Sequence, residues 1–209
     1  MDLELKDKVA LVTGGSRGIG RAIAHELASE GCHVAITARG GDNLASTKAE
    51  IESRGVRGLA IEIDMSISSS PAAAVEQTIR ELGAIHVLVN NVGGGFGDTN
   101  VEDSTDQQWE ESISTNLLAA VRSSRAAIPL MQKQRWGRII HITSIYGRES
   151  GGSPAYNASK SAMNSLSKTM ARDLAPDGIL VNAVAPGSIL FPGGGWEKAL
   201  QDDPEGMAV

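Results

Sequence analysis

The sequence predicts an α/β fold: a doubly wound parallel sheet of the Rossmann type, with helices on both faces. Short, continuous apolar runs alternate along the chain with longer stretches in which apolar residues recur at helical spacing. Strands that are buried on both faces have continuous apolar runs, whereas a half-exposed strand alternates. Repeated alternation of strand and helix favours a parallel sheet that is covered by helices.

Six short apolar runs are predicted to be the strands of this sheet. They cover residues 8–13, 33–38, 59–64, 85–90, 138–143 and 179–184. The predicted helices run from about Ile19 to Gly31, over about a dozen polar residues ending near Gly55, and over 71–82, 106–135, 154–174 and 195–200. The glycine-rich patches 93–97 and 192–195 each follow a strand end and are predicted to be loops.

The length indicates one domain over residues 1–209, large enough for a substantial core. After the sixth predicted strand only a loop and one short helix remain. The final residues, QDDPEGMAV, resemble the middle of a protein more than a solvated tail. We therefore expect that the final strand of the sheet is missing from this sequence.

The composition is that of an ordinary globular protein, with 41% hydrophobic and 21% charged residues. The net charge of −6 argues against general affinity for nucleic acid or an anionic membrane. The N-terminus is acidic where a signal peptide would be basic, and no run approaches the roughly 20 apolar residues that cross a bilayer. We expect a cytoplasmic protein.

Cysteine and histidine usage argues against a metal site. Cys32 is the only cysteine, which excludes an internal disulfide and a cysteine-cluster metal site. The histidines His25, His33, His86 and His141 are scattered without ligand spacing, so no metal is implied. The last three are expected at sheet edges or in core positions where their hydrogen bonds are satisfied.

Tyr156 and Lys160 are the strongest candidates for chemistry. They are four residues apart and so lie on one face of a helix, where a phenol and an ammonium can share a site. Ser153 and Pro154 are typical of an N-cap and first helical residue, which places Tyr156 in the first turn. We expect the lysine charge to lower the pKa of the phenol, although an isolated pair of this kind is more often structural.

A glycine-rich turn, TGGSRGIG at 13–20, follows the first predicted strand and opens the next helix. Gly14, Gly18 and Gly20 let the backbone turn sharply and approach a pyrophosphate at the helix N-terminus. The spacing differs from the G-x-G-x-x-G pattern of dinucleotide-binding folds. Glycine alone is a weak signal, because tight turns also need it, but the position between strand and helix strengthens it.

Five motifs in order make the chain resemble the short-chain dehydrogenase/reductase family, in particular its 3-oxoacyl-(acyl-carrier-protein) reductase-like members. They are TGGSRGIG (13–20), NNVG (90–93), Ser144 twelve residues before Tyr156, YNASK (156–160) and APG (185–187). The resemblance covers the chain up to about residue 190. It implies an oxidoreductase that transfers a hydride between NADP(H) and a small carbonyl or alcohol substrate.

The resemblance implies roles for four side chains. Tyr156 would protonate the carbonyl oxygen, or accept a proton from the alcohol, and Lys160 would assist it and hold the nicotinamide ribose. Ser144 would hydrogen-bond the substrate oxygen. Asn116 lies within a predicted helix, which it is expected to perturb, and in the family this perturbation holds a proton-relaying water. Without the motif order, Ser144 and Asn116 would be interpreted as polar cap or loop residues.

Charge near the second strand favours NADP(H) over NAD(H). That strand ends at Arg39 with no acid until Asp42, and Arg17 lies in the glycine turn. Two guanidinium groups without a carboxylate favour a phosphate-bearing cofactor, although either arginine alone would be an ordinary surface charge. The cofactor contacts implied by the resemblance, besides Tyr156 and Lys160, are Gly14, Ser16, Arg17, Gly18, Ile19, Gly20, Arg39, Asp64, Met65, Asn91, Val92, Gly93, Pro186, Gly187 and Ile189.

Two alternatives stay open. The chain could be a catalytically impaired NADP(H)-binding protein or a truncated fragment, because loss of the final strand would expose an apolar edge. It could also be an NAD-dependent alcohol dehydrogenase of the same family. The resemblance further implies a homo-oligomer, a dimer or tetramer that associates through its long helices. Candidate walls of the substrate pocket are Phe96, Tyr146, Phe191 and Trp196.

Overall fold

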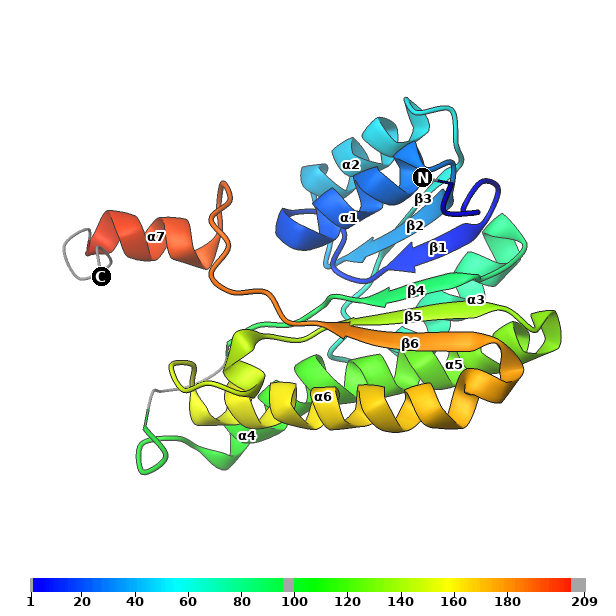
Figure 1. The fold of residues 1–209 in the computed structure, drawn as a ribbon. Helices are drawn as coiled ribbons and strands as arrows, with labels where there is room; N and C mark the ends of the chain where they lie inside the picture. The colour runs from blue at the N-terminus through cyan, green and yellow to red at the C-terminus, as the bar shows by residue number, and fades with distance from the viewer. Residues whose placement is uncertain (1, 96–99, 204–209) are drawn as a thin grey trace.

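A computed structural model describes residues 2–95 and 100–203 of the protein. Six parallel strands form one sheet in the order β3-β2-β1-β4-β5-β6 (Figure 1). The strands are β1 (Val9–Val12), β2 (His33–Ala38), β3 (Gly58–Glu62), β4 (Val87–Asn90), β5 (Gly137–Ile142) and β6 (Ile179–Val184). The predicted strand limits agree with these to within two residues at each end.

Helices cover both faces of the sheet, which confirms the predicted doubly wound architecture. The helices α1 (Gly18–Ser29) and α2 (Asp42–Glu52) lie over one face, above β1 to β3 (Figure 1). The helices α3 (Ser70–Leu82), α5 (Ala119–Gln134) and α6 (Pro154–Leu174) lie over the other. The short helix α4 (Asp106–Ser112) precedes α5, and α7 (Gly195–Asp202) projects from the body of the molecule.

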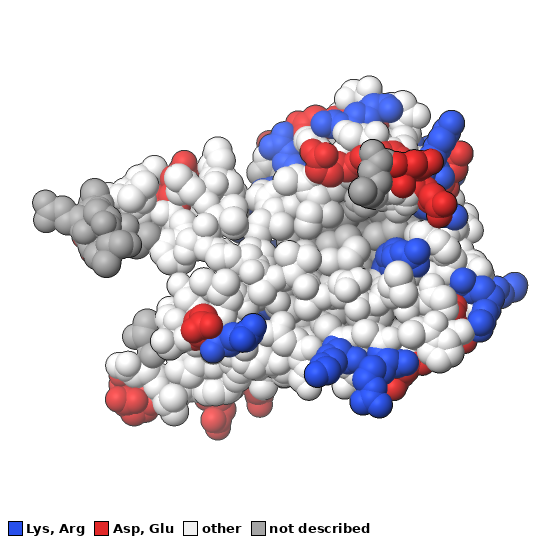
Figure 2. All heavy atoms as spheres, in the orientation of Figure 1, with Lys and Arg blue, Asp and Glu red and all other residues white. Residues whose placement is uncertain are grey.

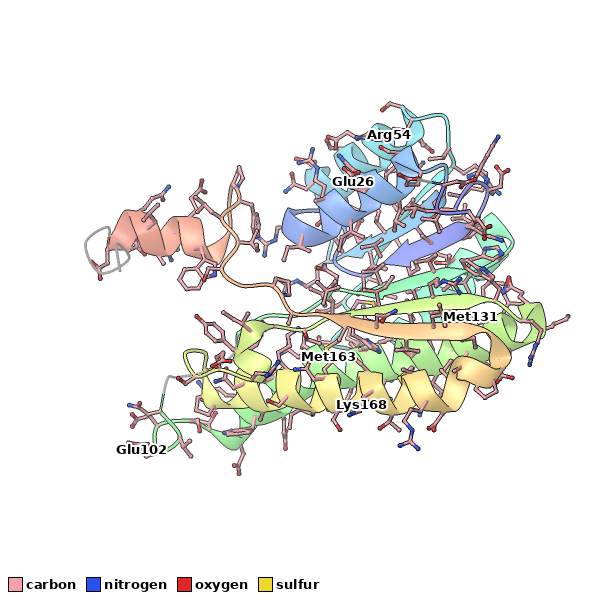
Figure 3. All side chains as sticks on the ribbon, viewed as in Figure 1. Glu26, Arg54, Glu102, Met131, Met163 and Lys168 are labelled. Carbon is pink, nitrogen blue, oxygen red and sulfur yellow. The ribbon has the colours of Figure 1, made fainter. Side chains whose placement is uncertain are left out.

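Two apolar cores hold these layers together, one on each face. Beneath α1 and α2, buried side chains such as Ala24 and Ile51 pack on β1 and β2. On the opposite face, Val75 of α3 and Met131 of α5 pack on Leu88 and the neighbouring strands. Met163 of α6 lies on the sheet-facing side of its helix and is fully buried (Figure 3). Because both faces are covered, the strands need the continuous apolar runs seen in the sequence.

The long helix predicted over 106–135 is interrupted. Between α4 and α5 the chain forms a π-helical segment, η1 (Ile113–Leu118), and Asn116 lies inside it. The expectation that Asn116 perturbs its helix is thus confirmed. The helix ends at Gln134, within one residue of the predicted limit, and Arg135 adopts a left-handed backbone with φ of 54° there.

The order of the strands places a crevice at the carboxyl edge of the sheet. The chain runs outward from β1 to β3 on one side and from β4 to β6 on the other. Loops that leave β1 and β4 therefore turn in opposite directions, and open α/β sheets bind ligands at this point. The turn after β1, the loop after β4 and the segments after β5 and β6 all meet there (Figure 1).

The edge strand β6 is apolar on both sides. Ile179 and Val181 are buried, whereas Leu180 and Val184 are 48% and 50% exposed. Figure 2 shows few charged side chains over the middle of this face, in contrast to the region of α1 and α2. Part of the apolar surface of β6 is therefore exposed. Within the described part of the chain, no helix is long and apolar enough to span a bilayer.

Candidate active site

A cleft of about 1110 Å³ opens at the carboxyl edge of the sheet, between the body of the molecule and the segment that leads to α7 (Figure 2). It brings together most of the residues that the sequence analysis singles out. Those that line it are Gly14, Ser16, Arg17, Gly18, Ile19, Gly20, Arg39, Asp64, Met65, Asn91, Val92, Gly93, Ser144, Tyr156, Lys160, Pro186 and Gly187.

Three of the residues predicted for the site are not among those that line the cleft. Ile189 does not line the cleft, and its side chain is 43% exposed. Asn116 lies behind the wall of the cleft and is fully buried. Phe96 falls outside the described residues. The other proposed pocket walls, Tyr146, Phe191 and Trp196, do line the cleft.

The glycine turn forms a cradle at the N-terminus of α1. Gly14 and Gly18 have φ of 67° and 54°, in the left-handed region that favours glycine. A Cβ atom at Gly20 would collide with the carbonyl oxygen of Gly14, so the helix and the turn approach closely. The first amides of α1 face the cleft with the positive end of the helix dipole, which suits a phosphate group.

Thr13 and Asn91 fix this turn to the loop after β4. The hydroxyl of Thr13 accepts hydrogen bonds from the backbone amides of Asn91 (2.9 Å) and Val92 (3.0 Å). The side-chain amide of Asn91 donates to the carbonyl oxygens of Thr13 (2.9 Å) and Gly14 (3.1 Å). Asn91 therefore acts as a tie between the two loops. Sequence reasoning missed Thr13, although its place at the end of the first strand was a usable signal.

The helix α6 delivers Tyr156 and Lys160 to the cleft. Pro154 is the first helical residue and Ser153 the N-cap, as predicted. Lys160 is 3% exposed, and its ammonium donates a hydrogen bond of 2.8 Å to the carbonyl oxygen of Ile142, at the end of β5. It lies 5.6 Å from the centre of the Tyr156 ring. The two side chains thus share one site, with the ammonium over the ring face.

The prediction of a lowered pKa for Tyr156 is wrong in this structure. Burial raises the pKa of the Tyr156 phenol, a hydrogen bond to Ser144 lowers it in part, and Tyr146 raises it further. Burial is the largest cause, and the Lys160 ammonium, which is bonded to the Ile142 carbonyl and lies over the Tyr156 ring, does not offset it. Burial also lowers the pKa of Lys160, from 10.5 to about 8. Burial disfavours the charged form of both groups.

Asn116 clamps the loop after β4. Its side-chain oxygen accepts from the amide of Gly94 (2.9 Å), and its side-chain nitrogen donates to the carbonyl of Gly94 (3.0 Å) and to Ser112 (3.2 Å). A Cβ atom at Gly93 would lie 2.7 Å from the Asn116 oxygen and 3.2 Å from the Lys160 nitrogen. Glycine at position 93 therefore lets the loop, the π-helical segment and the lysine meet.

The charges around the end of β2 are mixed. Arg17 and Arg39 are both exposed and both line the cleft, as the cofactor argument requires. Asp64 has a pKa below its usual value, chiefly because Ser66 donates hydrogen bonds to it, with a smaller contribution from Arg39. A Cβ at Gly40 would lie 2.6 Å from a carboxylate oxygen of Glu62. Sequence reasoning missed Glu62, because the pairing of β2 with β3 brings it to Gly40 although the two are distant in the chain.

The segment after β6 returns to the glycine turn. The ring of Phe191 packs on Gly18, where a Cβ atom would lie 2.7 to 3.0 Å from the ring carbons. Trp196, in the first turn of α7, lines the same cleft. The C-terminal segment thus contributes apolar walls close to the cofactor cradle.

The histidines lie apart from the cleft. His33 and His86 each accept a hydrogen bond from a backbone amide through Nδ1. The expected core position is confirmed for His141, and its Nδ1 atom lies 3.2 Å from the side-chain nitrogen of Asn90, but its Nε2 atom has no partner among the described residues. No group of three or more histidine, cysteine or acidic side chains suited to a metal ion is found in residues 2–95 and 100–203.

Comparison with known proteins identifies similar chains across most of this sequence. The sequence profile of the short chain dehydrogenase family matches residues 8–195. A 3-oxoacyl-(acyl-carrier-protein) reductase, FabG, from Staphylococcus epidermidis is 39% identical over 199 residues, which cover 94% of this chain and 80% of that relative.

Solved structures show the same architecture with two different cofactors. An L-sorbose reductase from Gluconobacter frateurii, solved with NADPH and L-sorbose, matches with a TM-score of 0.88 at 35% identity, over 97% of this chain and 82% of that one. A xylitol dehydrogenase bound to NAD⁺ matches with a TM-score of 0.87 at 32% identity, over 96% of this chain and 78% of that one.

Gly93→Ala is expected to destabilise the protein by about 1–3 kcal/mol, the usual cost of overpacking. The added methyl group must displace the Asn116 amide or the Lys160 ammonium. Gly95→Ala is the matched control, because a Cβ atom there has nothing within 4 Å. Urea unfolding followed by circular dichroism measures both variants. Equal free energies of unfolding for the two would show that the contact at Gly93 is not tight.

Lys160→Met is expected to stabilise the protein at neutral pH, and this gain in the free energy of unfolding should decrease as the pH rises. The pKa of Lys160 is about 8 in the fold and 10.5 ordinarily, so the unfolded chain binds the proton more tightly. Below pH 8 the lysine is charged in both states and its full penalty applies; above 10.5 it is neutral in both. The advantage of the methionine variant should shrink by up to about 3 kcal/mol across this interval.

Urea titrations of both proteins at several pH values between 7 and 10.5 test this expectation, with the upper limit set by the ordinary pKa. Lys168→Met removes an exposed lysine from the same helix (Figure 3) and should change the free energy of unfolding by less than about 0.5 kcal/mol. A Lys160→Met advantage that is constant with pH would contradict a lowered pKa.

Proposed function

The protein is an oxidoreductase of the short-chain dehydrogenase family, and we propose that it transfers a hydride between NADPH and a small carbonyl or alcohol substrate. The observation that carries this proposal is the position of Tyr156. Its phenol is hydrogen-bonded by Ser144 and lies beside the Lys160 ammonium, in the cleft that also contains the glycine cradle. The Tyr156 phenol, the Lys160 ammonium and the glycine cradle therefore share one cleft.

The residues of the cleft fit a dinucleotide. The close contact between Gly20 and Gly14 brings the turn against the start of α1, where backbone amides suit a pyrophosphate. Asp64 and Met65, after β3, would flank the adenine, and Lys160 would hold the nicotinamide ribose. Pro186 and Gly187 would border the nicotinamide. When bound, NADPH supplies the hydride, which is the redox chemistry of the reaction.

The chain itself supplies the proton. In the direction of reduction, the Tyr156 hydroxyl donates its proton to the carbonyl oxygen and becomes a phenolate. Burial raises the pKa of Tyr156, so the phenol keeps its proton until it is needed. The Ser144 hydroxyl orients the phenol, and the same hydroxyl can donate to the substrate oxygen. The Lys160 ammonium stabilises the phenolate that forms. Asn116 holds the loop beside the lysine through both hydrogen bonds to Gly94.

Arg17 and Arg39 support NADPH as the preferred cofactor. Both arginines line the cleft near the end of β2. A guanidinium group forms charge-assisted hydrogen bonds with a phosphate, such as the 2′-phosphate of NADPH. The solved sorbose reductase is an NADPH complex. A cytoplasmic location and a homo-oligomeric state, dimer or tetramer, stay predictions from the sequence.

NAD(H) is the second candidate cofactor. Glu62 lies against Gly40, and Asp64 interacts with Arg39, so carboxylates reach the region where a 2′-phosphate would bind. A carboxylate there repels a phosphate and suits the free ribose hydroxyls of NAD(H). The xylitol dehydrogenase with a similar fold binds NAD⁺. The balance between these acids and the two arginines decides the preference.

Tyr156→Phe is expected to lower kcat for carbonyl reduction by about 10²–10⁴-fold, the usual contribution of a general acid. The dissociation constant of NADPH should stay nearly the same, because the phenyl ring remains. The rate is followed by the loss of reduced nicotinamide absorbance, over a panel of 3-oxoacyl thioesters, diketones and ketoses.

Tyr146→Phe is the matched control, since Tyr146 lines the same cleft and carries no assigned proton transfer. It should retain most of the wild-type kcat. Full activity of Tyr156→Phe on a substrate that the wild type reduces would remove Tyr156 from the mechanism.

Arg39→Ala is expected to weaken NADPH binding about 10- to 100-fold, as loss of a hydrogen bond to a charged group implies. Binding of NADH should change little, because it lacks the 2′-phosphate. Isothermal titration calorimetry with each nucleotide gives both constants. Arg172→Ala, an exposed arginine on α6, is the control. A ratio of the two constants that Arg39→Ala leaves unchanged would contradict the assignment of the cofactor.

A further inference from the structure

A cluster of polar side chains lies inside the core, behind the cleft. Asn90 ends β4, His141 lies in β5 and Ser124 lies on α5, and their exposures are 2%, 0% and 1%. The side-chain nitrogen of Asn90 donates to the Ser124 hydroxyl (3.1 Å) and lies 3.2 Å from Nδ1 of His141. The cluster occupies the sheet face that α5 and α6 cover (Figure 1).

Two atoms of this cluster have no partner among the described residues: the side-chain oxygen of Asn90 and Nε2 of His141. Because the Asn90 amide donates to Nδ1, the neutral imidazole carries its proton on Nε2. One atom is therefore an acceptor and the other a donor. A buried polar atom without a partner is costly, and native proteins usually satisfy such atoms with an internal water.

His141 and Lys160 interact electrostatically. The Lys160 ammonium donates to the carbonyl oxygen of Ile142, the residue after His141 in β5. Burial, and then the charge of Lys160, lower the pKa of His141 to about 4. The polar groups that reach His141, directly or through Asn90, are those of Asn90, Ser124 and Lys160, and only the lysine is charged. The imidazole is therefore neutral at the pH at which the lysine is charged.

We propose that His141 is a positioning residue for Lys160: its imidazole and Asn90 hold an internal water next to the ammonium, and this polar pocket solvates the buried charge. The water accepts from Nε2 of His141 and donates to the Asn90 oxygen, which satisfies both unpaired atoms. The hydration site is distinct from Asn116, whose side-chain amide is already bonded to Gly94 and Ser112.

The pocket matters because Lys160 is almost fully buried. Of its three N–H donors, one is bonded to the Ile142 carbonyl. An apolar side chain at position 141 would extend the hydrophobic core up to the lysine and disfavour its charged form further. A role in packing alone would change the free energy of unfolding and leave the protonation of Lys160 as it is. The two roles therefore make different predictions.

His141→Leu and His141→Asn test the proposal, because asparagine keeps a polar group and leucine does not. Each variant is compared with the same variant carrying Lys160→Met, over a pH range that includes the lysine pKa of about 8. The difference in free energy of unfolding between the paired proteins reports the protonation of Lys160 alone. This free-energy difference changes with pH as Lys160 loses its proton. His141→Leu should shift the midpoint of that change to lower pH by about one unit, and His141→Asn should shift it much less.

This measurement needs no turnover, so it stands even if no carbonyl substrate is reduced and the proposed function fails. The inference rests on that function only for the importance of a charged Lys160. Where turnover is found, the alkaline limb of the pH profile of kcat should move with the same variant in the same direction.

An unchanged midpoint in His141→Leu, or an equal shift in both variants, would overturn the proposal. If His141→Leu does not fold, Ser124→Ala replaces it. This substitution removes the hydroxyl that accepts from Asn90 and should shift the midpoint in the same direction by a smaller amount. No shift with Ser124→Ala would then count against the polar pocket.

Discussion

The burial of the Lys160 ammonium is the constraint on which the rest of the site depends. A charge that is 3% exposed is costly unless it is bonded, and here the carbonyl at the end of β5 provides the bond. That bond requires α6 to lie close to the strand. It also requires Gly93, since any side chain there would meet the ammonium. The sheet edge, the helix and the loop after β4 are therefore placed around one charge.

The residues around Lys160 include features that lower the stability of the fold. Asn116 sits in a π-helical segment inside a long helix, where regular backbone hydrogen bonding would be more stable. The polar pair Asn90 and His141 replaces apolar residues at the ends of two core strands. Proteins tolerate such costs mainly at functional sites. The apolar cores beneath α1 and α3 supply stability that offsets the cost of the site.

Local patterns were sufficient to predict the fold, because buried strands and amphipathic helices have distinct periods in the sequence. The order of the motifs around Tyr156 was sufficient to select the residues of the cleft. What failed depends on tertiary placement. The pKa of Tyr156 rises because burial outweighs a cation that lies over the ring, and Glu62 reaches Gly40 only through the pairing of β2 with β3. The left-handed backbone of Arg135, a non-glycine residue, is likewise not indicated by any local pattern.

The opposite pKa shifts of Tyr156 and Lys160 have a common cause and a common consequence. Burial disfavours the phenolate and the ammonium alike, so either group is costly when charged alone. A phenolate beside an ammonium, in contrast, has no net charge and loses less by burial. Loss of one proton from the pair can therefore leave either the neutral pair or the ion pair. The two groups therefore titrate as a coupled pair. The environment of Lys160, which includes His141, influences the pH at which Tyr156 releases its proton.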